Sequence, residues 1–443
     1  MSSEETERKV ARVAQLTREL VKLCGDGRVD TADPFAFWVP GRIEVLGKHT
    51  DYGGGRSLLC ATERGIVALA HPHDDNSQSV ARVRIRDANS GDTSEFELSA
   101  NVVSAPGHWS NYPITVARRI ATNFGGPMRG ADIVFASDLP FAAGASSSSA
   151  LVVAIFLVLS AVNDLPARPE YQENIRTRED LAGYLGCVEN GLDFKSLCGG
   201  AGVGTFGGSE DHTAILCAQP DSLVQYSFGP VTFERSIALP AGYVFVVGAS
   251  GVVAEKTGGA LEHYNRVSRR LSVGLECWRK ATGRADMSMG AAVASSRNAH
   301  ELIREVLLGA TNTDYPAESL TERFDQFYAE SSEIIPAAGD ALARGDLVEF
   351  GELVARSQRG AERGLRNQIP ETIALVRQAR ELGAVAASAF GAGFGGSVWA
   401  IVDSSRVETF RQSWADAYGE AFPESAHRSV FFVTRAGPAA TPL

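Results

Sequence analysis

The sequence lacks the features that mark zinc-binding, secreted and membrane-spanning proteins. Its 443 residues include six cysteines but no C-x-x-C pair, so neither a zinc site nor a dithiol redox motif is indicated. Scattered thiols suit a reducing compartment and no apolar leader core is visible, so we expect a cytoplasmic protein. The longest apolar run, 150–162, is too short to cross a bilayer and suits a buried helix.

Positive charge is also scarce. Lys and Arg total 42 against 53 Asp and Glu, which gives a formal net charge of −11. This balance argues against nucleic acid or an anionic membrane as the main partner. An anionic ligand would need positive charge gathered locally.

What remains is the composition of an ordinary globular protein, with 44% hydrophobic and 21% charged residues. The first half is rich in strand patterns and the second in helix patterns, so we expect two domains, 1–230 and 231–443. Helices are expected at 4–24, 109–123, 150–162, 261–279, 317–344 and 347–358. Strands are expected at 35–39, 57–69, 81–86, 94–98, 243–248 and 398–402, with a hairpin-like pair at 213–219 and 223–228.

The segment 40–55 carries the strongest chemical signal. It places Arg42, Lys48, His49 and Asp51 among glycines, directly after an apolar strand. A structural turn needs one or two glycines but not four such polar side chains beside them. The segment therefore predicts contact with a small polar ligand.

A serine run, 146–149, precedes a charge-free apolar stretch that reads as a buried helix. Backbone N–H groups at a helix N-terminus attract phosphate, and a serine hydroxyl there can reach Mg²⁺. The alternative is a serine that only caps a core helix. No Gly-Lys-Ser or Gly-Lys-Thr follows, so this is not a Walker A loop.

Two more segments are rich in glycine. Residues 391–396 precede an apolar strand, and alone they would be explained by a tight turn. Residues 198–212 hold so many glycines that we expect no regular element there, and close approach to a ligand or to a second backbone.

Taken in order, these motifs resemble those of the GHMP kinases, and among them most closely the galactokinases. Residues 41–54 follow the family's Gly-Arg-Val-Asn-Leu-Ile-Gly-Glu-His-Thr-Asp-Tyr-Asn-Gly nearly throughout, residues 140–150 resemble its phosphate loop, and residues 391–396 its third motif. Residues 109–112 resemble a Trp-Ala-Asn-Tyr segment near the adenine, and residues 262–266 a Glu-Tyr-x-x-Arg segment. The resemblance implies an α+β fold of two domains, the first like ribosomal protein S5 domain 2 and the second ferredoxin-like.

The resemblance also implies an activity, the ATP-dependent phosphorylation of a monosaccharide, most simply at the C1 hydroxyl of galactose or a close relative. Asp211 is the implied catalytic base and Arg42 its electrostatic partner, with Glu210 the rival for the base. Mg²⁺ would be bound by Ser148 and Glu189. The sugar would be contacted by Lys48, His49, Thr50, Asp51 and Tyr264. ATP would be bound by Trp109, Ala142, Ala143, Gly144, Ala145, Ser146, Ser147 and Ser148, with the third loop, Gly393, Gly395 and Gly396, beside them.

One departure from the family bears on the substrate. Lys48 stands where the family has a Glu, so an acceptor becomes a three-donor cation. Lys48 could pair with a carboxylate of the sugar, which predicts a uronic acid as substrate. It could instead point at an acidic neighbour and leave galactose as the substrate. A third alternative is a galactokinase-like sugar sensor without turnover, although the complete serine run favours catalysis.

Overall fold

The computed structural model describes residues 3–25, 34–73, 81–140, 144–252, 259–311 and 314–443. Its centre is a long antiparallel pair, β1 (Phe35–Leu46) and β2 (Arg56–Pro72). The strand expected at 35–39 is confirmed but continues through the first half of the glycine motif. Arg42 and Glu44 therefore lie on a strand, two residues apart and on the same side of it.

The larger sheet has the order β12-β1-β2-β5-β3-β4, and β6 and β7 extend it from β2. The strand expected at 57–69 is confirmed within β2, and those expected at 81–86 and 94–98 are confirmed as β3 and β4, each shifted by one residue. The last strand, β12, returns the end of the chain to β1. The remaining strands of this sheet are β3 (Arg82–Asp87), β4 (Thr93–Glu97), β5 (Ala131–Ser137), β6 (Ser222–Ser227), β7 (Thr232–Ala238) and β12 (Thr441–Pro442).

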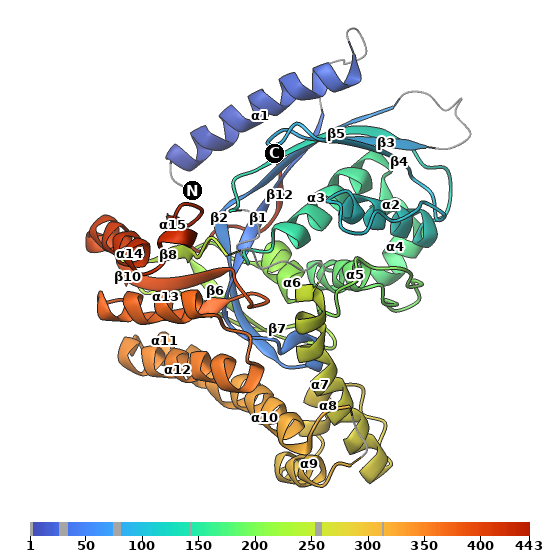
Figure 1. Ribbon diagram of the computed structural model, residues 1–443. Helices are drawn as coiled ribbons and strands as arrows, with labels where there is room; N and C mark the ends of the chain where they lie inside the picture. The colour runs from blue at the N-terminus through green and yellow to red at the C-terminus, as the bar shows by residue number, and fades with distance from the viewer. Residues whose placement is uncertain (1–2, 26–33, 74–80, 141–143, 253–258, 312–313) are drawn as a thin grey trace.

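Helices cover both faces of this sheet (Figure 1). On one face lies α1 (Ser3–Cys24), whose Leu16 and Leu20 pack on Trp38 and Val67. On the other face α3 (Ser147–Val162) is buried on nearly every side, as its unbroken apolar run predicts. Around it lie α2 (Asn111–Asn123), η2 (Leu165–Ala167), α4 (Pro169–Asn174), α5 (Arg178–Asn190) and α6 (Glu210–Cys217).

The hairpin expected at 213–219 and 223–228 is wrong. Residues up to Cys217 continue α6, and only the second arm is a strand, β6. The glycine-rich segment likewise ends in helix, since Glu210 begins α6. A short apolar run does not distinguish a buried helix from a buried strand, and here the run packs against α5 and β1.

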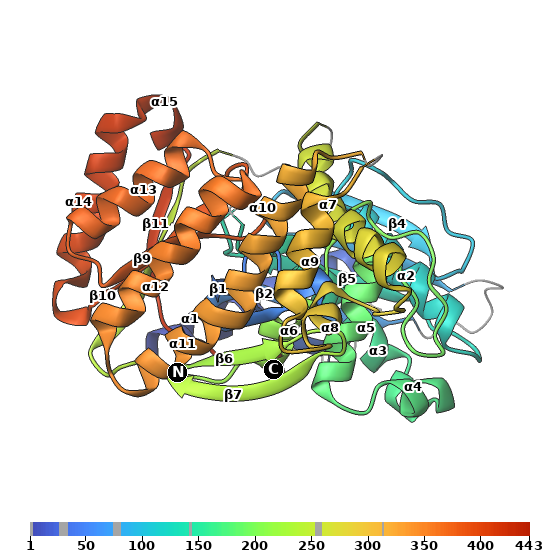
Figure 2. The ribbon, with the colours of Figure 1, turned by 90° about the horizontal axis from the view of Figure 1, so that it is seen from below.

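A second sheet has the order β11-β8-β10-β9, which confirms the strands expected at 243–248 and 398–402. Helices α13 and α14 cover one face of this sheet, and α11 and α12 cover the other. Figures 1 and 2 show α13 and α14 at the opposite side of the molecule from α2 and α5. The elements here are β8 (Tyr243–Ala249), η3 (Ala329–Ile334), α11 (Ile335–Ala343), α12 (Leu347–Gly360), η4 (Ala361–Leu365), α13 (Pro370–Glu381), β9 (Ala386–Phe390), β10 (Ser397–Asp403), η5 (Ser404–Arg406), α14 (Val407–Ala421), α15 (Pro423–Ala426) and β11 (Val430–Thr434).

A group of helices with a separate apolar core completes the fold. It consists of α7 (Gly259–Thr282), α8 (Met289–Val293), α9 (Ala299–Leu308) and α10 (Ala317–Tyr328). The predicted α+β class is confirmed. The predicted boundary after residue 230 lies between β6 and β7, which pair with each other, and the division into domains stays a prediction. Across the described residues, no helix is both long enough and apolar enough to cross a bilayer.

Candidate active site

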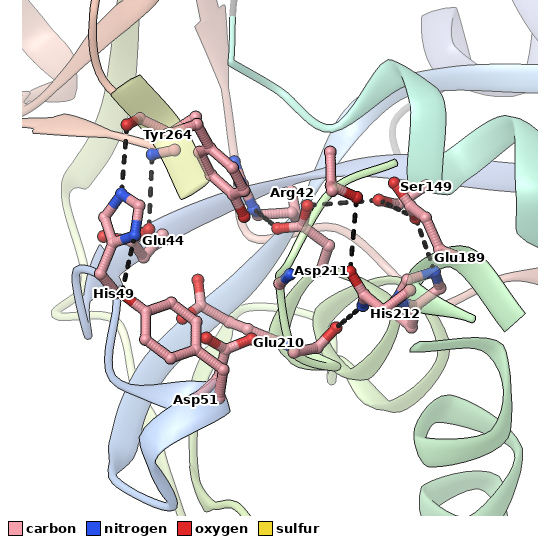
Figure 3. Close-up of a pocket in the computed structure, with 17 residues that line it drawn as sticks. Arg42, Glu44, His49, Asp51, Ser149, Glu189, Glu210, Asp211, His212 and Tyr264 are labelled. Carbon is pink, nitrogen blue, oxygen red and sulfur yellow. Dashed lines mark hydrogen bonds and ion pairs between the residues drawn. The ribbon is translucent and has the colours of Figure 1, made fainter. Parts of the chain in front are cut away.

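A pocket forms where β1, the start of α6, the start of α7 and the third glycine loop meet (Figure 3). It gathers side chains from the first motif, the serine run, α5 and the glycine-rich segment. The lining residues are Arg42, Glu44, His49, Asp51, Tyr52, Ser149, Glu189, Asn190, Thr205, Gly207, Gly208, Glu210, Asp211, His212, Tyr264, Gly391 and Ala392.

The expected catalytic pair meets in this pocket. The Arg42 Nε donates to Asp211 Oδ1 at 2.7 Å, and its Nη1 donates to the carbonyl of Gly144. The Arg42 side chain is buried, so this ion pair is little screened by water. Arg42 thus joins the carboxylate in the first turn of α6 to the loop that leads into α3.

The serine run opens α3, as predicted. Ser146 precedes the helix with a left-handed backbone, φ 57°, and the hydroxyls of Ser146 and Ser147 are buried without a hydrogen-bond partner in the protein. Unpaired donors at a helix N-terminus, next to Gly144 at φ 73°, fit the phosphates of a nucleotide. Ala142 and Ala143 lie outside the described residues.

The serine that meets Glu189 is Ser149, one residue beyond the predicted Ser148. Its hydroxyl donates to Glu189 Oε2 at 2.8 Å and lies 3.3 Å from Asp211 Oδ2. Ser148 instead shares a hydrogen bond with Tyr112, whose pKa burial raises to about 12. Glu189 is buried in α5 and also contacts His212 Nε2 at 3.1 Å.

A hydroxyl and a carboxylate suit Mg²⁺, which binds few protein ligands and completes its shell with water and phosphate oxygens. No cluster of three or more His, Cys, Asp or Glu side chains within the described ranges could hold a metal by itself. The donors present therefore fit a Mg²⁺ that arrives with a nucleotide.

On the other side of Asp211, His49 is fixed by hydrogen bonds to both ring nitrogens. Its Nε2 lies 3.1 Å from the carbonyl of Ala392 and its Nδ1 lies 3.1 Å from Tyr52 Oη. A carbonyl only accepts, so the proton is on Nε2 and Nδ1 accepts from Tyr52. Arg323 in turn donates to Tyr52 Oη, so a chain of hydrogen bonds sets this ring.

Asp51 and Tyr264 complete this side of the pocket. Asp51 Oδ2 accepts from the backbone N–H of Glu210 at 3.1 Å and so caps α6. Burial raises the pKa of Asp51, and this backbone bond opposes the rise. A Cβ at Gly208 would lie 2.3 Å from Asp51 Oδ2, so glycine is needed there. The glycine-rich segment thus lines the pocket, and its predicted approach to a second backbone is confirmed at Gly208, where an added Cβ would lie 2.9 Å from the backbone nitrogen of Tyr52.

Two predicted sugar contacts do not line the pocket. Lys48 is buried, and its Nζ donates to Ser357 Oγ at 3.1 Å. Ser357 donates onward to Glu330, so Lys48 points toward an acidic neighbour. Thr50 is also buried, and its hydroxyl lies 2.8 Å from the carbonyl of Gly47 and 2.6 Å from that of Arg56. It holds the turn together.

The third glycine loop packs against the phosphate loop. A Cβ at Gly391 would lie 2.8 Å from the Gly144 carbonyl oxygen, which leaves room only for hydrogen. Gly393, Gly395 and Gly396 all have positive φ, as a sharp loop between β9 and β10 requires.

Trp109 lies outside the pocket, before α2, with its ring centroid 5.7 Å from that of Phe135.

Two buried glutamates in the pocket have altered acidity. Burial raises the pKa of Glu44 to about 7, although Lys48 and Arg42 pull it down. Burial also raises the pKa of Glu210, whose Oε2 accepts from Ser57 at 2.7 Å. The Glu210 carboxyl group is thus bonded to Ser57, whereas that of Asp211 is bonded to Arg42.

Glu44 and Ser149 are among the lining residues that sequence reasoning did not assign to the site. The signal for Glu44 was present, because a strand places every second residue on one face and Arg42 precedes it by two. The signal for Ser149 was weaker, because a run of four serines does not show which hydroxyl faces inward until the helix start is known.

Three family models match the chain. They are the GHMP kinases N-terminal domain over residues 111–199, the galactokinase galactose-binding signature over 28–72, and the GHMP kinases C-terminal domain over 340–420. The chain is 29% identical over 398 residues to a galactokinase of Roseiflexus sp. (strain RS-1), covering 90% of each chain. It is 28% identical over 409 residues to a galactokinase of Actinobacillus pleuropneumoniae, covering 91% of this chain and 92% of that one.

Solved structures share the fold. The galactokinase of Lactococcus lactis, complexed with galactose, matches with a TM-score of 0.77 at 22% identity, covering 97% of this chain and all of that one. The mevalonate kinase of Methanococcus jannaschii matches with a TM-score of 0.54 at 11% identity, covering 92% of this chain and 99% of that one. The chain therefore shares the fold of these two kinases.

Proposed function

The chain belongs to the GHMP kinase superfamily, and on that premise we propose that this sugar kinase transfers the γ-phosphoryl group of ATP to the C1 hydroxyl of galactose or a close relative. The proposal rests on one observation above all. The ion pair of buried Arg42 with Asp211 lies between a set of hydroxyl donors at the start of α3 and a set of sugar-binding candidates around His49.

The phosphate side of the site would hold the nucleotide. The free hydroxyls of Ser146 and Ser147 and the first N–H groups of α3 would bind phosphate oxygens. Ser149 or Ser148, together with Glu189, would bind Mg²⁺. Bound Mg²⁺-ATP supplies the phosphoryl group with much of its charge neutralised.

The sugar side would hold the acceptor. Asp51 accepts hydrogen bonds, and the fixed His49 ring and the Tyr264 hydroxyl face the same space (Figure 3). Held there, a hydroxyl is aligned with the phosphoryl group, and alignment supplies a large part of the acceleration in this reaction class.

Asp211 would accept the proton of that hydroxyl. Its Oδ1 is held by Arg42, and its Oδ2 lies toward Ser149. Arg42 keeps the carboxylate oriented and offers positive charge where negative charge develops. Its second contact, to the carbonyl of Gly144, ties that charge to the phosphate loop.

The test is ADP release with ATP and Mg²⁺ across a panel of galactose, arabinose, fucose and glucose. Asp211→Asn should lower kcat by about 10²–10⁴-fold, the range for loss of a general base. Glu210→Gln is the matched control, because its carboxyl group is bonded to Ser57, and it should keep most of the activity. If kcat falls in Glu210→Gln and is kept in Asp211→Asn, Glu210 and not Asp211 is the catalytic base.

A further inference from the structure

The pocket is strongly acidic. Its lining residues, within the part of the chain that the structure describes, include a single Arg or Lys, Arg42, and this side chain is committed to Asp211. Against it stand five carboxyl groups, those of Glu44, Asp51, Glu189, Glu210 and Asp211. Those carboxyl groups that are ionised repel a further carboxylate in a buried site, so this lining disfavours an acceptor that carries a carboxylate of its own.

Four of these five carboxyl groups are bonded within the protein at distances up to 3.1 Å. Asp211 bonds Arg42, Glu210 bonds Ser57, Asp51 bonds a backbone N–H, and Glu189 bonds Ser149. Each of these four groups therefore already has a hydrogen-bond partner within the protein.

Glu44 differs from the other four. One oxygen, Oε2, accepts a long bond of 3.4 Å from the backbone N–H of Gly391, and the other, Oε1, is buried with no hydrogen-bond partner. The residue is only 3% exposed, so water does not readily satisfy that oxygen. A buried acceptor without a partner is costly, and a ligand that donates a hydrogen bond to it removes the cost.

Glu44 lies on the sugar side of the site. It contacts Gly391, and His49 contacts the neighbouring Ala392, so both side chains meet the same short loop. Figure 3 shows Glu44 beside His49, across Arg42 and Asp211 from Ser149 and Glu189. Glu44 therefore lines the pocket nearer the proposed acceptor side than the nucleotide side.

Lys48 supports this arrangement from outside the pocket. Its ammonium donates to Ser357, and its charge opposes the effect of burial on Glu44. Lys48 is thus a positioning residue, which favours the ionised form of Glu44 without touching the acceptor.

We propose that Glu44 is a specificity-determining residue, whose unpaired oxygen accepts a hydrogen bond from a hydroxyl or ammonium group of the acceptor. The site then takes neutral sugars and amino sugars and excludes uronic acids. This inference rests on the proposed function, because it assumes that the pocket binds a sugar.

The test is kcat/KM for galactose, galactosamine, 6-amino-6-deoxygalactose and galacturonate, in the wild type and in Glu44→Gln. The wild type should use galacturonate at least about 100-fold less well than galactose. Gln keeps the size and one acceptor but removes the charge, so Glu44→Gln should narrow that gap about tenfold or more. In Glu44→Gln, kcat/KM for at least one of the two amino sugars should fall by a larger factor than kcat/KM for galactose. Two results would overturn the proposal. One is an unchanged ratio of kcat/KM between galactose and galacturonate in Glu44→Gln, and the other is a fall in kcat/KM for both amino sugars that is no larger than the fall for galactose.

Lys48 provides a second readout that a purely structural role would not move. Lys48→Met removes a positive charge and should raise the pKa of Glu44. The pH above which the enzyme prefers an amino sugar to galactose, by kcat/KM, should therefore move upward. Lys48→Arg keeps the charge and should return this pH toward the wild-type value. No movement of that pH would contradict the positioning role. The charged groups that act on Glu44 are Arg42, Lys48, Glu210, Asp211 and Glu330.

The same variants separate this inference from the proposed function. If the wild type turns over no sugar, the kinase proposal fails, and calorimetric binding of galactose and galacturonate then tests Glu44. Tighter binding of galactose, with a preference that weakens in Glu44→Gln, would support the role of Glu44. Equal binding of both sugars by the wild type would overturn it.

Discussion

Arg42 and Asp211 lie 169 residues apart in the chain, yet their side chains form an ion pair with 2.7 Å between Nε and Oδ1. The arginine comes from β1 and the aspartate from the first turn of α6. Since Arg42 also binds the carbonyl of Gly144, one guanidinium group orients the candidate base and the phosphate loop together.

Arg42→Lys should separate those two tasks. A lysine keeps the charge but lacks the planar fork, so it cannot hold Asp211 and the Gly144 carbonyl in the same geometry. We expect kcat to fall by about 10–1,000-fold, with a smaller change in KM for the sugar. Arg64→Lys, which changes an arginine stacked on Phe432 outside the pocket, is the control in steady-state kinetics. Equal kcat in both variants would contradict the role of Arg42.

Gly391→Ala should weaken nucleotide binding. The new methyl group would lie 2.8 Å from the Gly144 carbonyl oxygen, so the phosphate loop has to move. Gly242→Ala is a matched control, because Gly242 has a similar φ of 85° but nothing within 4 Å of the added carbon. Both variants share the backbone strain of about 1 kcal/mol. KM for ATP should rise severalfold in Gly391→Ala alone, and a similar rise in both would assign the effect to backbone strain.

Ser149→Ala should lower kcat by roughly tenfold, since Glu189 and Asp211 lose a hydroxyl that lies within reach of both. Ser160→Ala removes a buried hydroxyl farther along the same helix and should leave kcat unchanged. The measurement is kcat at several Mg²⁺ concentrations. A full loss in Ser148→Ala with normal kcat in Ser149→Ala would place the important hydroxyl one residue earlier.

Asp132 on β5 should make folding stability depend on acid pH. Burial alone would raise the pKa of this carboxyl group, but hydrogen bonds from His73 and Arg84 outweigh burial and lower it to about 2. The ionised form is therefore favoured in the folded protein. The ionised carboxylate contributes fully to the free energy of unfolding above about pH 4, which is the pKa of an Asp in the unfolded chain. This contribution disappears as the pH falls toward 2.

Urea unfolding of the wild type and Asp132→Asn tests this directly. Near pH 6 the wild type should be more stable by about 1–2 kcal/mol, after allowance for solvent screening. Near pH 2.5 most of this difference should be gone. A difference that stays constant across this range would show that packing, and not the charge, explains it.

Much of the site was predictable because its chemistry is local. The segment around Arg42 and His49, the serine run and the third loop each combine glycine or serine with a strand or helix boundary, and such combinations can be read without knowing the fold. The placement of Asp211 opposite Arg42 came from the order of these motifs and from the family resemblance.

What the sequence did not settle depends on contacts between distant segments. The Lys48 side chain points toward Ser357, which lies 309 residues farther along the chain. No local sequence pattern predicts this contact. The helix that begins at Glu210 is capped by Asp51, whereas its apolar run alone was equally compatible with a strand. The inward-facing serine depended on where α3 begins.

The most direct test of the central claim is ³¹P NMR of the product formed from galactose, ATP and Mg²⁺. The wild type should give a resonance coupled to the anomeric proton, which shows phosphate on C1. Asp211→Asn should bind galactose, by calorimetry, and form that product at least about 100-fold more slowly. Binding of galactose and ATP by the wild type without this product, or equal product formation by Asp211→Asn, would contradict the account.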